Sequence, residues 1–360
     1  MSNCNKSSFQ NAGKILLKLH PKLPCRTLTK RSFQKAVRIL YKLNRKLSPS
    51  VTLTLNIASI TRGVESPASS KTAAAPSVLR IAEAGAYYFD DVAAVEEPLE
   101  IRLQQGNAPA RSLTVTMRTP GHDAELAAGF LVTEGVLDDA AALQAIRISE
   151  PVPSGTDGCV LPVGSATNIV TVELSEDAQV RMASLERNFY TTSSCGICGK
   201  ASLLALRSVC PPRRSNALEL DFKVLSAMPE VFRAEQATFQ QTGGLHAAAL
   251  FSARGELQLL REDVGRHNAV DKLIGARFLL DELPLRDAVL MLSGRVSFEL
   301  MQKAVMAGLP AVAAVGAPSS LAIAVAREFD VTLIGFLRED RCNVYHGAHR
   351  LRRGAQGGGT

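Results

Sequence analysis

The stretch Val289-Leu290-Met291-Leu292-Ser293-Gly294-Arg295 decides the fold class of this chain. Its first four residues form an apolar run of the length of a buried strand, and Ser293-Gly294 ends that run. A helix is predicted over residues 297–306, and a second apolar run follows at 311–315. The order strand, helix, strand is typical of a βαβ unit, in which the two strands are parallel neighbours.

The same alternation extends to both sides of this stretch. Further strands are predicted at 247–251, 257–260 and 331–336, and further helices at 269–280 and 319–329. Strands that alternate with helices indicate the α/β class, with a largely parallel sheet in the C-terminal half and helices that cover it.

The N-terminal half is less regular. Strands are predicted at 100–103, 113–117 and 169–174, with a helix over 123–133 that stops at Gly135. A longer helix is predicted over 229–241 and ended by Gly243-Gly244. We expect one main domain over 81–350, within which 90–180 is a candidate smaller subdomain, and a flexible tail at 351–360.

Composition places the chain among globular proteins. It has 360 residues, of which 46% are hydrophobic and 21% charged. Its seven cysteines are odd in number and scattered, which argues against a disulfide framework and for a reducing compartment. We therefore expect a cytoplasmic protein.

The net charge of +7 comes from the N-terminal segment. Residues 1–64 hold 13 Lys or Arg and no acid. Because the whole chain has 41 basic and 34 acidic residues, the remainder holds 28 basic against 34 acidic residues. Such a tail suits nucleic acid, acidic lipid or targeting, but we expect residues 1–80 to be a basic, low-complexity, disordered extension. Nucleic-acid binding through this tail is a minor alternative.

One uncharged stretch, 307–326, is long enough to cross a bilayer. It contains Gly308, Pro310, Gly316 and Pro318, which divide it into two shorter elements. The sequence therefore predicts no transmembrane segment.

The most chemically distinctive motif is Ser194-Cys195-Gly196-Ile197-Cys198-Gly199-Lys200. A Cys-x-x-Cys pair is found in redox sites, in half of a zinc site, or in a loop with one reactive thiol. Zinc is disfavoured because the other cysteines are all single, and a thioredoxin motif is disfavoured because residues 187–194 are polar rather than an apolar strand. Basic neighbours such as Lys200 and Arg207 favour a low thiol pKa, so one cysteine is a candidate nucleophile.

Small and charged residues follow the predicted strands at 262–268, 293–295 and 316–320. In sheets of this kind ligands bind beyond the carboxyl ends of the strands, where helix amino ends favour anions. We expect a polyanion such as a nucleotide, although no P-loop and no dinucleotide fingerprint is present. His246 and His267 also lie in these loops, and both a local hydrogen-bonding role and catalysis are open for them.

Several separated blocks together resemble one known family, the formate dehydrogenase accessory sulfurtransferases (FdhD). The blocks are Glu96-Glu97-Pro98-Leu99, Arg118-Thr119-Pro120-Gly121-His122-Asp123, Ser193-Ser194-Cys195-Gly196-Ile197-Cys198-Gly199-Lys200, Thr242-Gly243-Gly244-Leu245-His246, and the stretches 261–271 and 292–299. The resemblance covers residues 90–346 in the order of the family.

The resemblance implies a three-layer α/β/α fold like that of cytidine deaminases, without their zinc and with no catalytic metal, in a homodimer. It implies that a cysteine desulfurase hands sulfur to the protein as a persulfide on Cys195. The protein then sulfurates the bis(molybdopterin guanine dinucleotide) molybdenum cofactor before its insertion into formate dehydrogenase. Cys198 is a helper by the same resemblance. A chaperone that binds this cofactor without sulfur chemistry is the alternative.

The resemblance also places contacts to the cofactor near the C-terminus. The corresponding residues are Phe336, Leu337, Arg338, Glu339, Asp340 and Arg341. Two arginines suit the phosphates of the guanine dinucleotide. The two acids would repel phosphate, so we expect them to orient the arginines or to accept from the N–H groups of guanine.

Overall fold

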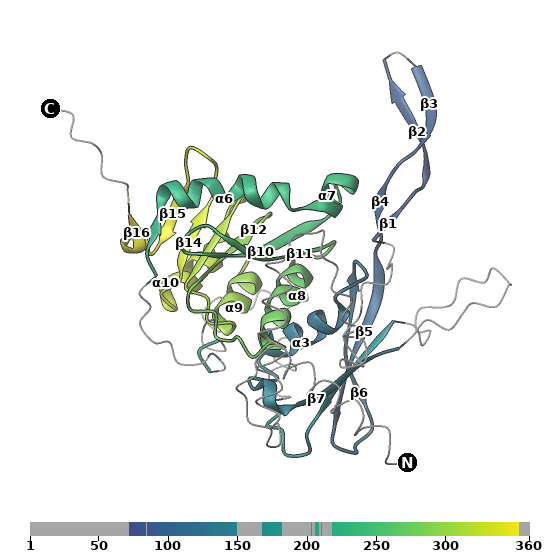
Figure 1. Ribbon diagram of the computed structural model, residues 1–360, viewed down its shortest axis with the longest axis vertical. Helices are drawn as coiled ribbons and strands as arrows, with labels where there is room; N and C mark the ends of the chain where they lie inside the picture. The colour runs from purple at the N-terminus through teal and green to yellow at the C-terminus, as the bar shows by residue number, and fades with distance from the viewer. Residues whose placement is uncertain are drawn as a thin grey trace, which may run out of the picture. The chain divides into compact units, whose positions relative to one another are not determined.

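The computed structural model describes residues 72–83, 85–149, 168–181 and 218–352, with 203, 206–208 and 210, and all structural statements below concern these residues (Figure 1). Residues 1–71 and 353–360 lie outside them, as do Cys195 and Cys198. The expectations for the basic extension, the end of the tail and the cysteine motif therefore stay predictions.

A six-stranded sheet forms the centre of the C-terminal half. Its strands are β10 (His246–Ser252), β11 (Leu257–Asp263), β12 (Ala288–Leu292), β13 (Ala311–Ala314), β14 (Thr332–Gly335) and β15 (Asn343–His346). Their order is β11-β10-β12-β13-β14-β15. The β12/β13 and β13/β14 pairs are parallel and the other three pairs are antiparallel.

The expectation of a largely parallel sheet is therefore wrong, and the sheet is mixed. One reason lies in the connection at the β11 end of the sheet. Only residues 253–256 separate β10 from β11, and Gly255 has a φ of 80° there, so the two strands form a hairpin. A parallel pair needs a crossover of a dozen residues or more.

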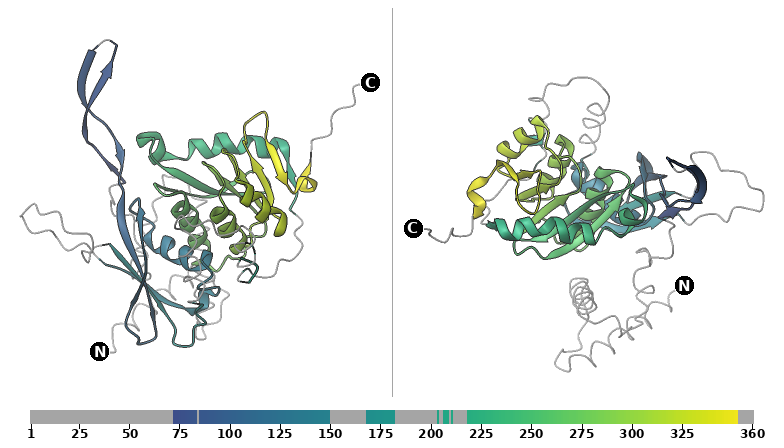
Figure 2. Two further views of the ribbon diagram at one scale, coloured as in Figure 1. Left: turned by 180° about the vertical axis from the view of Figure 1, so that it is seen from behind. Right: turned by 90° about the horizontal axis from the view of Figure 1, so that it is seen from above.

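Helices cover both faces of this sheet (Figures 1 and 2). One face carries α8 (Arg266–Phe278), α9 (Phe298–Met306) and α10 (Ser320–Glu328), and the other carries α6 (Phe222–Ala234) and α7 (Ala237–Thr242). Side chains along β12 alternate between the two: Leu290 packs in the larger core cluster, whereas Val289 and Met291 pack in the smaller one. The likeness to cytidine deaminases stays a prediction.

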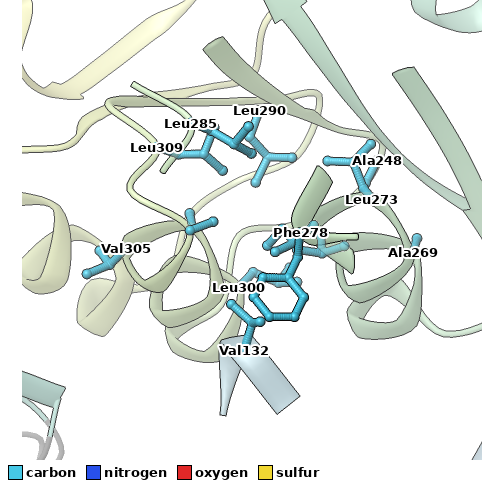
Figure 3. Close-up of a cluster of buried hydrophobic side chains, with 14 of the residues drawn as sticks. Val132, Ala248, Ala269, Leu273, Phe278, Leu285, Leu290, Leu300, Val305 and Leu309 are labelled. Atoms are coloured by element: carbon cyan, nitrogen blue, oxygen red, sulfur yellow. The ribbon is translucent and has the colours of Figure 1, made fainter. Parts of the chain in front are cut away.

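The larger core joins the sheet to the N-terminal half (Figure 3). Val132 on α3 (Asp123–Thr133) lies in the same cluster as Phe278 on α8 and Leu300 on α9. A four-stranded sheet packs on α3 with the order β6-β5-β8-β7. Its strands are β5 (Glu97–Gln105), β6 (Arg111–Arg118), β7 (Leu143–Ile148) and β8 (Ile169–Leu174). The predicted helix over 123–133 and the strand over 169–174 are confirmed.

Short elements complete the described chain. The hairpin β2 (Ser77–Ala82) and β3 (Gly85–Asp90) begins inside the segment predicted to be an extension. Two-residue strands pair β1 (Ala73–Ala74) with β4 (Ala93–Ala94) and β9 (Leu220–Asp221) with β16 (Leu351–Arg352). Single 3₁₀ turns lie at η2 (Ala140–Ala142) and η3 (Ala348–Arg350).

The helix predicted over 229–241 is wrong in its extent. Helix α6 begins seven residues earlier, where the side chain of Asp221 accepts from the amide of Lys223 and caps it. Pro229 lies inside the helix and is buried against the sheet together with Phe232, and this burial offsets the backbone bond that proline removes. A second helix, α7, ends at Gly243 in the left-handed conformation, as predicted.

The uncharged stretch 307–326 divides into β13 and the first part of α10, as predicted. Within the described ranges, no helix has both the length and the apolar character needed to cross a membrane.

Candidate functional site

The loops after β12, β13 and β14 meet at one edge of the six-stranded sheet. The amide of Phe336 donates to the carbonyl of Gly316 at 3.1 Å, and the amide of Gly316 donates to the carbonyl of Gly294 at 3.1 Å. The amide of Val296 donates to the carbonyl of Ala317 at 3.0 Å. These three loops therefore share one edge of the sheet, which we call the carboxyl edge.

Two glycines let the backbones approach closely at the carboxyl edge. A Cβ atom on Gly316 would lie 2.6 Å from the carbonyl oxygen of Gly294, which is closer than real Cβ atoms come. A Cβ atom on Gly294 would lie 3.4 Å from Nδ1 of His246, at the start of β10. The imidazole of His246 therefore packs against the backbone of Gly294.

Residues 336–341, which we call the 336–341 turn, leave β14 at this edge. The amide of Leu337 donates to the carbonyl of Ala314 at 3.0 Å, and its side chain is buried in the smaller core. The amide of Arg338 donates to the carbonyl of Arg341 at 2.9 Å and closes the turn. Phe336 has a φ of 52°, which costs a bulky residue strain, and its side chain is 42% exposed. The turn therefore holds an aromatic ring in solvent.

Three of the four charged side chains of the turn are engaged with protein groups. Nη1 of Arg338 donates to the carbonyls of Val315 at 2.9 Å and Leu337 at 2.8 Å. Nη1 of Arg341 pairs with Oδ2 of Asp340 at 3.1 Å, and both side chains are about seven-tenths exposed. Glu339 is exposed beside them. The six residues predicted as cofactor contacts are therefore brought together, with a net charge of zero.

The start of α8 brings a second polar group to the carboxyl edge. Burial first, then the charges of Lys303 and Arg266, lower the pKa of His267 to about 4. Burial and Arg266 likewise lower the pKa of His246. Nε of Arg266 and Nε2 of His267 are buried without a hydrogen-bond partner. Two imidazoles that are neutral at pH 7 thus lie beside a permanent guanidinium cation.

A buried carboxylate fixes the residues just before α8, which begins at Arg266. Asp263 is fully buried, and its Oδ2 pairs with Nζ of Lys272 at 2.7 Å. Its Oδ1 accepts from the amide of Gly265 at 2.8 Å, and its Oδ2 accepts from the amide of Thr119 at 3.2 Å. The carboxylate therefore links the start of α8 to the 118–123 block. Sequence reasoning placed both blocks in one family pattern but did not identify this ion pair.

His122 and Glu125 resemble a deaminase His-x-Glu pair only superficially, since the spacing is one residue too long. In the structure Oε1 and Oε2 of Glu125 accept from Arg261 at 2.8 and 2.5 Å. Burial alone would raise the pKa of Glu125, but hydrogen bonds from Arg261 and His122 outweigh it and lower the pKa to about 2. This carboxylate is therefore one partner of an ion pair.

A second buried ion cluster lies below the edge, between three helices. Nζ of Lys303 on α9 lies 3.0 Å from Oδ2 of Asp271 on α8, 3.0 Å from Oγ1 of Thr133 on α3, and 2.9 Å from Oε1 of Glu134. Lys303 and Asp271 are both buried. Sequence reasoning missed this cluster. One signal was available in the sequence. Lys303 falls on the apolar face of its helix, three residues after Leu300 and four residues before Ala307.

The residues that the structure describes offer few candidate side chains for sulfur chemistry or for binding a metal ion. The predicted site cysteines, Cys195 and Cys198, lie outside them. Cys342 follows the 336–341 turn and is half-buried, and this burial raises the pKa of its thiol. Within the same described ranges, no group of three or more His, Cys, Asp or Glu is arranged to hold a metal ion.

Comparison with known proteins identifies the family. The family model described as FdhD/NarQ matches residues 94–352. A protein named Sulfur carrier protein FdhD from Mycolicibacterium paratuberculosis is 52% identical over 260 residues, which cover 71% of this chain and 90% of that protein. A protein of the same name from Streptomyces avermitilis is 49% identical over 281 residues, covering 76% and 94%.

Among solved structures, one described as a formate dehydrogenase accessory protein from Desulfotalea psychrophila has a TM-score of 0.58 and 23% identity. The match covers 78% of this chain and all of that one, and it shows a shared fold. The family match spans both sheets and the carboxyl edge, and the sequence identity to the two curated relatives extends over most of their length. This chain therefore belongs to the FdhD/NarQ family.

Proposed function

We propose that this protein is a sulfur carrier of formate dehydrogenase maturation. It accepts sulfur from a cysteine desulfurase as a persulfide on Cys195 and passes it to the bis(molybdopterin guanine dinucleotide) molybdenum cofactor, which is its substrate. The names of the curated relatives support the sulfur-carrier role, and the description of the structural neighbour supports the link to formate dehydrogenase. We place this activity in the cytoplasm and in a homodimer.

The observation that carries the cofactor part of this proposal is the 336–341 turn. Phe336 is held in a strained left-handed conformation with its ring in solvent, and such strain is concentrated at functional sites. An exposed aromatic ring offers a stacking surface for a base. The neighbouring carboxylates of Glu339 and Asp340 are acceptors that suit the N–H donors of guanine. The turn therefore has the chemistry of a guanine site.

The sulfur step follows from thiol–disulfide exchange. The Cys195 thiolate attacks the outer sulfur of the desulfurase persulfide, a new S–S bond forms, and the cysteine of the desulfurase leaves as a thiolate. One S–S bond replaces another, so this step needs no oxidant. Basic residues near the motif, such as Lys200, favour the thiolate that the attack requires.

Cys198 provides a route for release of the sulfur. Its thiolate can attack the inner sulfur of the Cys195 persulfide, which frees the outer sulfur as hydrosulfide for the cofactor and leaves a Cys195–Cys198 disulfide. A cellular dithiol reductant then restores both thiols. A cofactor that takes the sulfur directly from Cys195 would make Cys198 dispensable, so Cys198→Ser separates the two routes.

The test of the proposed function is complementation of a strain that lacks the protein. The unchanged chain is expected to restore formate dehydrogenase activity, whereas Cys195→Ala is expected to abolish it while the purified variant keeps its thermal unfolding midpoint. Full activity with Cys195→Ala would instead support the chaperone that binds the cofactor without sulfur chemistry. Cys342→Ala, outside the motif, is the matched control.

A further inference from the structure

The 336–341 turn suits a base better than it suits phosphates. Arg338 uses Nη1 to hold two backbone carbonyls, and Arg341 is paired with Asp340. The exposed carboxylates of Glu339 and Asp340 would repel a phosphate placed on the turn. A guanine nucleotide bound there needs cations and N–H donors for its phosphates elsewhere.

Such groups lie farther along the same carboxyl edge. Arg266, a permanent cation, interacts electrostatically with the neutral rings of His246 and His267. Its Nε and the Nε2 of His267 are both buried polar atoms without a partner, although the great majority of buried polar atoms in folded proteins are hydrogen-bonded. His246 comes from β10 and the other two side chains come from α8. The oxygens of a ligand would supply acceptors for the Nε–H group of Arg266 and, in its Nε2–H tautomer, for His267.

The backbone around these side chains is open to an anion. Gly294 presents bare backbone beside the ring of His246. Helix α8 begins at Gly265 with no side-chain cap and no acid in its first turn. In contrast, Oγ of Ser319 caps the start of α10 by accepting from the amide of Ala322. Oδ1 of Asp263 already accepts from the amide of Gly265, but no side chain caps the first turn of α8, and the amides of that turn are available to a ligand.

The distance between His246 and the 336–341 turn is short enough for one nucleotide to reach both. His246 begins β10, and β12 and β13 lie between β10 and β14 in the sheet. Three strand steps correspond to about 14 Å across a sheet. This span is comparable to that from the base to the terminal phosphate of an extended nucleoside diphosphate.

Negative charge near these groups is limited but present. Glu299, in the first turn of α9, is exposed and interacts with both Arg266 and His267. Lys303 and Glu134 also act on His267, and they are paired with each other below the edge. Arg295 is exposed on the loop between Gly294 and α9 and is a further cation of the carboxyl edge.

We infer that Arg266, His246 and His267 form a phosphate subsite that is separate from the base-binding 336–341 turn. The subsite takes the phosphates of the guanine nucleotide moiety of the substrate. This inference rests on the proposed function, because it assumes that the turn binds guanine.

Calorimetric titration of the full-length protein with GDP and with guanosine tests the subsite. Arg266→Gln is expected to weaken GDP binding at least tenfold and to leave guanosine binding unchanged, because guanosine has no phosphate. Arg341→Gln is expected to change both affinities by the same factor. Arg254→Gln is the matched control, since Arg254 is an exposed arginine in the hairpin turn at the opposite edge of the sheet, and it should change neither affinity.

Three results would overturn the inference or its basis. If GDP affinity is unchanged in Arg266→Gln and reduced only in Arg341→Gln, the phosphates bind at the 336–341 turn. Failure of the unchanged protein to bind either compound would overturn the guanine site itself, and the subsite with it. If Arg266→Gln lowers the unfolding midpoint, Arg266→Lys replaces it: GDP affinity should fall several-fold with guanosine affinity intact, and an equal loss of both would reject the subsite.

Discussion

Gly129 on α3 and Gly275 on α8 lie where the two helices cross with their backbones in contact. A Cβ atom on Gly129 would fall 1.9 Å from the carbonyl oxygen of Asp271, and a Cβ atom on Gly275 would fall 1.8 Å from the carbonyl oxygen of Glu125. This crossing brings α3 close enough for Thr133 to reach Asp271 at 2.7 Å. It therefore joins the N-terminal sheet to the helix that carries the candidate site.

Replacing either glycine by alanine should separate the two helices. Gly275→Ala is expected to lower the free energy of unfolding by about 3 kcal/mol or more, because backbone atoms cannot move aside as side-chain ends can. Gly244→Ala is the control, since its Cβ atom would meet Ala94 at an ordinary 3.5 Å. Urea unfolding measures both variants, and equal small losses would show that the crossing is looser than described.

Removing Lys303 alone from the buried cluster should lower the free energy of unfolding more than removing Lys303 together with the charge of Asp271. Lys303→Met leaves Asp271 and Glu134 without their cation, and the expected loss is about 3–5 kcal/mol of unfolding free energy. Adding Asp271→Asn removes one of the two stranded carboxylates, so part of the loss should be regained. Chemical denaturation of the single and double variants measures this. A double variant with the summed loss of the two single variants would contradict the cluster.

His267 should make stability depend on pH. Its folded pKa of about 4 lies below the ordinary 6.5, so the unfolded chain takes up the proton first and stability falls as the pH drops from 6.5 toward 4. Between pH 7 and pH 5 this amounts to roughly 2 kcal/mol as an upper limit. His267→Gln should remove that part of the slope.

His349→Gln is the matched control for this measurement, because His349 is exposed. Urea unfolding at pH 7 and pH 5 gives the slope for each variant. A slope that His267→Gln leaves unchanged would place the pH dependence in other groups.

The left-handed conformation of Phe336 should lower the stability of the protein, and its ring should contribute to nucleotide binding. Phe336→Gly relieves the left-handed strain, so the free energy of unfolding should rise by about 1 kcal/mol while affinity for GDP and guanosine falls. Asp281→Gly is the control, because Asp281 also has a positive φ, of 56°, but follows α8 away from the carboxyl edge. It should gain stability without changing affinity. Unchanged nucleotide binding in Phe336→Gly would show that the ring of Phe336 does not take part in binding.

The positions of the elements from β10 to β14 followed from the sequence, but the direction of the strands did not. Apolar runs and glycine or proline breaks are local, and they located every strand from β10 to β14. Strand direction depends on which neighbour each strand joins. The only local signal was the short connection after Phe251, which is too brief for a crossover helix. The polar strand β15 was missed because residues 343–346 lack an apolar run.

The location of the candidate site in the fold could be predicted from the sequence, but the contacts of its side chains could not. Topology alone brings the ends of β12, β13 and β14 to one edge, and the predicted 336–341 segment lies there. The commitment of Arg338 to backbone carbonyls, and the positive φ of Phe336, depend on tertiary contacts. No residue type in the segment indicates either feature.

The central claim is that Cys195 carries sulfur, and the mass of the cysteine-containing peptide tests it most directly. The unchanged protein is incubated with a cysteine desulfurase and cysteine, alkylated, digested and analysed by mass spectrometry, with Cys195→Ser and Cys198→Ser in parallel. The account predicts one additional sulfur atom on Cys195, present in Cys198→Ser and absent from Cys195→Ser. A peptide without added sulfur, or one that keeps it in Cys195→Ser, would contradict the account.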